Sequence, residues 1–90
     1  MAFIVTKPIA DHIKEVTLTV NQLAGDKILA KYPLYRQINI ARTTDAEVMY
    51  EWIDQVRVLA QATKTDISIA PSIVEIRSAT TLFIDNLQLI

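Results

Sequence analysis

The sequence predicts a mainly α-helical protein, a small bundle of two to three long helices with one short helix. Three segments carry apolar residues at alternating steps of three and four, the spacing of a helix that buries one stripe. Each of the three prolines precedes an apolar-periodic segment, and proline is tolerated in the first turn of a helix. One glycine and no low-complexity tract in 90 residues indicate a single domain, residues 1–90.

The first long helix is expected after Pro8. Gly25 interrupts its stripe, and residues 27–32 (KILAKY) either continue the helix or restart it. Residues 16–20 (VTLTV) are β-branched and alternate in a way that also fits a strand, and residues 3–6 (FIVT) can be extended. The apolar stripe consists of Ile9, Ile13, Val16, Val20 and Leu23.

A short helix is expected over residues 33–42 (PLYRQINIAR) and a long one over residues 43–64. Thr44 and Glu47 have the spacing of a capping box, in which two side chains satisfy N–H groups at the start of a helix. The stripe of the long helix consists of Met49, Trp52, Val56 and Leu59, broadened by Val48 and Ile53.

The last third of the chain allows two interpretations. Residues 66–70 (DISIA) alternate like a strand, and isoleucine, valine and threonine, which favour strands, dominate the segment after Pro71. The apolar period nevertheless holds over several turns, which favours a helix and leaves β structure as the alternative. The stripe after Pro71 consists of Ile73, Ile76, Thr80, Phe83, Leu87 and Ile90.

The composition bounds the environment and the oligomeric state. Hydrophobic residues make up 51% of a chain too small to cover that much apolar surface, so we expect a homo-oligomer. No apolar run approaches the roughly 18 residues that span a bilayer. The apolar stretch at the start of the sequence is too short for a signal peptide. We therefore expect no membrane contact and synthesis in a cytoplasm.

No pattern for catalysis is present, so we expect a protein that is not an enzyme and has no catalytic, metal or cofactor site. His12 is the only histidine and there is no cysteine, whereas a metal site needs three or four ligands. No serine lies in a G-x-S-x-G elbow, and Gly25 alone cannot form a phosphate loop.

A net charge of −1 disfavours nucleic acid as a partner. Lys27, Lys31, Arg36 and Arg42 nevertheless cluster around one segment, so a small regulatory protein that binds DNA or a host protein remains an alternative.

That segment, residues 31–42 (KYPLYRQINIAR), concentrates amphipathic side chains. Tyr32 and Tyr35 combine apolar area with a polar tip, while Gln37 and Asn39 can bond to backbone at an elbow between helices. The segment is therefore either a docking elbow for a neighbouring subunit or an internal corner. The candidate interface residues are Tyr32, Pro33, Tyr35, Arg36, Gln37, Asn39, Trp52 and Phe83.

The same segment resembles a short pattern in small tailed-phage virion proteins and in terminal regions of tail-fibre-associated proteins. That pattern places a basic residue, Tyr-Pro, an aromatic residue and Gln-x-Asn between two helices. It matches Lys31, Tyr32, Pro33, Tyr35, Gln37 and Asn39. The aromatic residue is often tryptophan in the pattern, and residues 69–78 stand where a short proline-rich tail is usual.

The resemblance implies a structural role in a virion, at a tail or fibre attachment, with other virion proteins as partners. Its other implication is that the chain is made in the host cytoplasm and resides in the particle. A cellular coiled-coil adaptor is the remaining alternative, since heptad spacing alone also fits that class.

Overall fold

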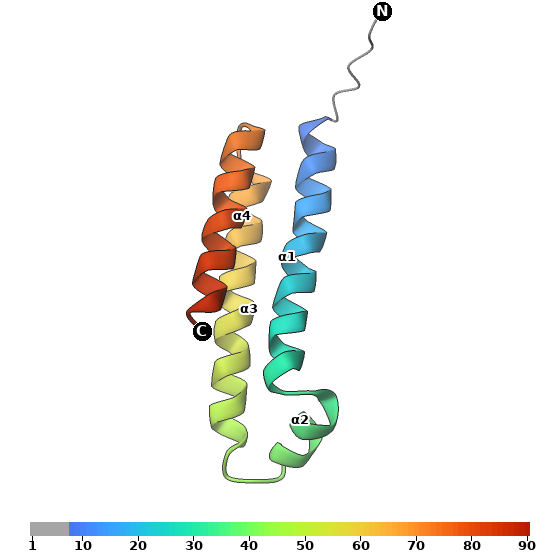
Figure 1. The fold of residues 1–90 in the computed structure, drawn as a ribbon, viewed down its shortest axis with the longest axis vertical. Coiled ribbons are helices and arrows are strands. Elements are labelled where there is room, and N and C mark those ends of the chain that lie inside the picture. Colours follow the sequence, from blue (N-terminus) through green and yellow to red (C-terminus); the bar gives the residue numbers. More distant parts are fainter. Residues whose placement is uncertain (1–7) are drawn as a thin grey trace, which may run out of the picture.

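A computed structural model describes residues 8–90 and contains four helices (Figure 1). Three long helices lie side by side as a bundle, and a short helix turns across its lower end. The helices are α1 (Ile9–Lys31), α2 (Leu34–Ile40), α3 (Ala46–Ser68) and α4 (Ile73–Gln88). No strand occurs among these residues, so the mainly α prediction is confirmed and the β alternative for the last third is wrong. Residues 3–6 lie outside the described part of the chain.

The core lies along the line where α1, α3 and α4 meet. Each long helix contributes one stripe of apolar residues to this core. Phe83 of α4, which is 1% exposed, is among the largest side chains that the core encloses. None of the helices in the described part of the chain is long and apolar enough to cross a membrane. The buried apolar residues are Val20, Ala24, Tyr32, Met49, Trp52, Ile53, Val56, Ala60, Ile67, Ile76, Phe83 and Leu87.

Helix α1 continues through Gly25 to Lys31, so the helix is continued rather than restarted. Val20 is fully buried and Val16 packs against the core, and this burial outweighs the strand preference of residues 16–20. Gly25 faces open space, because a Cβ atom built there would have no heavy-atom neighbour within 4 Å.

The capping box expected at the start of α3 does not form. Asp45 precedes the helix, and no side chain caps it. Thr43 instead organises the turn, since its hydroxyl donates to the Ile40 carbonyl at 2.8 Å and accepts from the Asp45 N–H at 3.2 Å. The turn that enters α3 is therefore held by the residue before the expected cap.

Two threonines at or near the core, Thr63 and Thr80, show how residues that favour strands are accommodated in these helices. The Thr80 hydroxyl donates to the Ile76 carbonyl at 2.8 Å, and the Thr63 hydroxyl donates to the Leu59 carbonyl at 2.9 Å. Each hydroxyl is thus satisfied within its own helix. The strand-like residues 66–70 begin as the last turns of α3, where Ile67 is buried.

We predict that Phe83→Ala lowers the free energy of unfolding by about 3–5 kcal/mol, because it leaves a cavity between three helices. Urea denaturation followed by circular dichroism measures this loss. Val58→Ala is the control, since Val58 is exposed on α3, and its effect should stay within about 0.5 kcal/mol. Equal effects of the two substitutions would contradict the central position of Phe83.

Candidate interaction surface

The end of α1 is set by Tyr32 and Pro33. The Tyr32 N–H donates to the Ile28 carbonyl at 2.7 Å, as the last bond of the helix. Pro33 has no N–H and cannot extend the series. Its carbonyl accepts from the N–H groups of Arg36 and Gln37, at 2.9 Å each, and so opens α2 in a new direction.

Two side chains of α2 reach back to α1. The Gln37 side-chain amide donates to the Tyr32 carbonyl at 2.7 Å, and the Arg36 guanidinium donates to the Lys31 carbonyl at 3.2 Å. The last carbonyls of a helix have no partner within it, so these bonds satisfy groups that water would otherwise occupy. The Asn39 side chain, by contrast, forms no hydrogen bond with another residue of the described chain.

An aromatic pair lies beneath the elbow. The rings of Tyr32 and Trp52 meet edge to face, with centroids 5.5 Å apart and planes at 63°. Lys31 Nζ lies 4.4 Å from the Trp52 ring centroid, and Arg36 Cζ lies 5.5 Å from the Tyr32 ring centroid. Two basic residues of the expected cluster thus make cation–π contacts within the chain.

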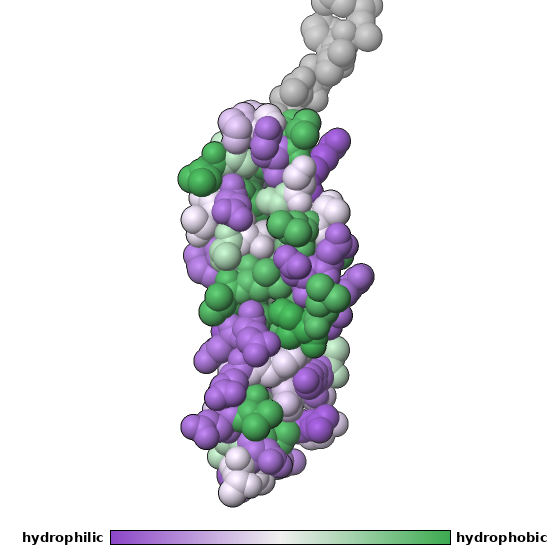
Figure 2. All heavy atoms as spheres, turned by 90° about the vertical axis from the view of Figure 1, so that its left-hand side faces the viewer, coloured by the Kyte–Doolittle hydropathy of each residue, from purple (hydrophilic) through white to green (hydrophobic). Residues whose placement is uncertain are grey.

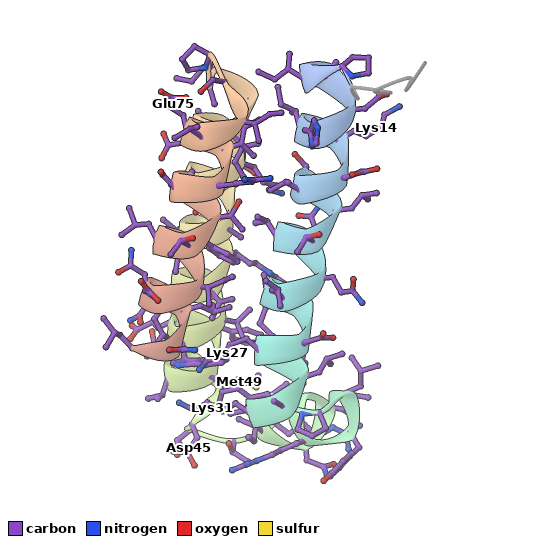
Figure 3. The ribbon with its side chains drawn as sticks, turned by 45° about the horizontal axis from the view of Figure 1, so that its top comes forward. Lys14, Lys27, Lys31, Asp45, Met49 and Glu75 are labelled. Atoms are coloured by element: carbon purple, nitrogen blue, oxygen red, sulfur yellow. The ribbon has the colours of Figure 1, made fainter. Side chains whose placement is uncertain are left out.

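The same tryptophan connects this end of the bundle to Ile90, two residues after the end of α4. The Trp52 indole N–H donates to the Ile90 carbonyl at 3.3 Å. Trp52 of α3 therefore contacts residues at the end of α1 and after the end of α4, and it fixes where these three helices come together. Figure 3 shows Lys31 and Met49 close to this end, with Asp45 in the turn below them.

The outward side of α2 is apolar. Leu34, Tyr35 and Ile38 are 67%, 70% and 60% exposed, and their spacing places them on one side of the helix. No residue of α2 is buried. We call these three residues the α2 face.

The structure divides the candidate interface residues into an inner and an outer set. Tyr32, Trp52 and Phe83 are buried in this chain's own core, Pro33 and Gln37 are half-buried at the elbow, and Tyr35, Arg36 and Asn39 are exposed. Sequence reasoning did not single out Leu34 and Ile38. The four-residue spacing of Leu34 and Ile38, with Tyr35 between them, could have indicated an apolar side of the short helix. The sequence offers no further apolar stripe that would cover that side.

The remaining polar residues form no compact group. No cluster of three or more histidine, cysteine, aspartate or glutamate side chains in residues 8–90 could hold a metal ion. His12 is half-buried on α1, and Glu47 and Glu51 are exposed on α3. Arg42 is exposed in the turn after α2, and Lys27 is half-buried near the lower end of α1 (Figure 3).

Comparison of the sequence with protein-family models found no matching family, and comparisons with curated proteins and with solved structures found no match.

We predict that Gln37→Ala lowers the free energy of unfolding by about 1 kcal/mol, because the half-buried Tyr32 carbonyl loses its side-chain donor. Hydrogen exchange should show a loss of protection in α2 before any loss in α3. Asn39→Ala is the matched control, as it removes a side-chain amide of the same helix that makes no hydrogen bond with any of residues 8–90. Equal stability and equal hydrogen exchange of the two variants would show that the Gln37 hydrogen bond does not stabilise the elbow.

Proposed function

We propose that this chain is a non-enzymatic structural protein of a tailed-phage virion that assembles through apolar helix faces, at a tail or fibre attachment. The observation that carries the proposal is the α2 face. Three large apolar side chains stand exposed on a helix that buries none of its residues. Contiguous exposed apolar groups of this kind mark protein–protein contacts.

The elbow favours binding because it fixes the α2 face in advance. Pro33, Gln37 and Arg36 tie α2 to the end of α1 through backbone and side-chain hydrogen bonds. A surface that is ordered before contact loses less conformational freedom on binding. Residues 31–42 thus both hold α2 in place and carry the α2 face.

The size of the face suits a contact that is repeated in an assembly. Burial of the exposed parts of three such side chains contributes roughly 3–5 kcal/mol before the cost of association. One contact of this strength is weak in solution, but several contacts held in one particle reinforce each other. A role in a multi-subunit particle therefore fits better than a role as an isolated high-affinity binder.

The virion as the setting rests on the resemblance of residues 31–42. Tyr32, Pro33 and Gln37 of the shared pattern hold the elbow, while Tyr35 faces solvent. This division supports a pattern that maintains a docking geometry. DNA binding has less support, because Lys31 and Arg36 are already placed over aromatic rings.

We predict that Tyr35→Ala reduces the mass of the assembled protein in light scattering and leaves its helix content unchanged. The substitution removes the largest exposed side chain of the α2 face without touching the core. Tyr50→Ala is the matched control, since Tyr50 is a surface tyrosine of α3 outside the face. An unchanged mass for Tyr35→Ala would exclude the α2 face from the assembly.

The virion setting has its own test. Mass spectrometry of purified tailed-phage particles, produced from the genome that encodes this chain, should detect its peptides beside those of the tail proteins. Particles in which tail proteins are detected and this chain is absent would overturn the assignment to the virion, whatever the result for Tyr35.

A further inference from the structure

The outer side of α4 carries a second periodic stripe. Val74, Ser78, Thr81 and Asp85 follow each other at steps of four, three and four, on the side opposite the core residues Ile76, Phe83 and Leu87. Only Val74 of these four residues is apolar, so the stripe is more polar than the seam of a stable coiled coil. The stripe is a surface of α4 distinct from the α2 face.

The same side of α4 also exposes large apolar residues, at the start of the helix, next to Thr81 and just after the last turn. Val74, Leu82 and Leu89 are between 61% and 84% exposed. Ser78 and Thr81 between them line a shallow hollow. Figure 2 looks onto the side of the molecule where α4 lies, and apolar side chains form patches among polar ones there. Small central residues allow a second helix to approach closely.

Two opposite charges flank the middle of the stripe. Arg77 and Asp85 are exposed, and neither has an ion pair with another residue of the described chain. They are eight residues apart, about 12 Å along the helix, which is too far for them to pair with each other. Each is four residues from Thr81, on opposite sides of it.

We propose that two copies of this chain pair α4 against α4 in antiparallel orientation, around a two-fold axis at Thr81. The axis brings Arg77 of one copy beside Asp85 of its partner, and the reverse, so that both charges are matched. It also places Val74 at one end against Leu89 of the partner subunit. The pair adds a second contact to the proposed assembly function and uses none of the α2 face.

The charges select the orientation. A parallel pair in register would place Arg77 beside Arg77 and Asp85 beside Asp85, and like charges that face each other are destabilising. The contact is a single helix pair, smaller than the roughly 800 Å² per partner of a standard interface. We therefore expect a weak dimer, whose fraction rises with protein concentration across the micromolar range.

Cysteine cross-linking tests the orientation, because the chain contains no cysteine. Under mild oxidation Thr81→Cys should cross-link to itself, since the two side chains meet at the axis, within the short distance that a disulfide requires. Val74→Cys should cross-link to Leu89→Cys when the two proteins are mixed, but not to itself. Efficient self-linking of Val74→Cys, or no linking at any of these positions, would overturn the proposal.

Charge reversal provides a second readout that does not depend on oxidation. Arg77→Glu and Asp85→Arg should each reduce the dimer fraction at least several-fold in sedimentation velocity, while a mixture of the two should recover it. The double variant should also dimerise like the unchanged chain. A mixture or double variant that remains monomeric, with circular dichroism showing intact helices, would contradict the Arg77–Asp85 match.

The same cross-linking experiment in a Tyr35→Ala background separates this inference from the proposed function. Retained Thr81→Cys linking with a reduced assembled mass is the expected result. Loss of linking in both backgrounds would overturn the α4 pair alone, and an unchanged assembled mass would overturn the role of the α2 face alone.

Discussion

The geometry of the lower end depends on one missing N–H group. Pro33 cannot donate to the carbonyl that would continue α1, so the helix stops and the chain turns. The turn leaves the Tyr32 carbonyl free to accept from Gln37 and directs the Tyr32 ring onto Trp52. Because α2 starts from this elbow and lies across the end of the bundle, its outward residues have no neighbouring helix to cover them.

A second constraint is the narrowness of the core. Each long helix buries one stripe of heptad spacing, which is enough to hold three helices together but leaves their other sides uncovered. Large exposed apolar residues are consequently found on every helix, for example Leu18 on α1, Ile38 on α2, Val48 on α3 and Val74 on α4. The high hydrophobic content of the chain is thus not explained by its interior alone.

Periodicity was a better guide to this fold than composition. The stripe from Met49 to Leu59 and the stripe that contains Ile76 and Phe83 both appear in the core or against it. Threonine and the β-branched residues supported only the β alternative for the last third, which is wrong, because their preference for strands is weak beside the burial of a whole stripe. A helical threonine such as Thr80 also satisfies its hydroxyl locally, which composition does not reveal.

The details of the elbow were beyond the sequence for a different reason. Tyr32 and Tyr35 have the same chemistry and lie three residues apart, yet one is 8% exposed and the other 70%. The difference arises from Trp52, twenty positions further along the chain from Tyr32, which receives only one of the two rings. Similarly, the Thr44–Glu47 spacing fits a capping box, but the turn is held instead by the Thr43 hydroxyl, which bonds to the Ile40 carbonyl and the Asp45 N–H.

The two surfaces differ in what they could build. A contact of α4 with itself is isologous, so it closes after two copies and adds nothing further. A contact of the α2 face with a different surface of a neighbour is heterologous, and it continues until a ring closes or a filament grows. A subunit that carries both would assemble from dimers, and any closed ring of such dimers would contain an even number of chains. Whether the number of chains in the assembly is even or odd is therefore set by the two contacts together. It follows from their symmetry and not from the strength of either surface.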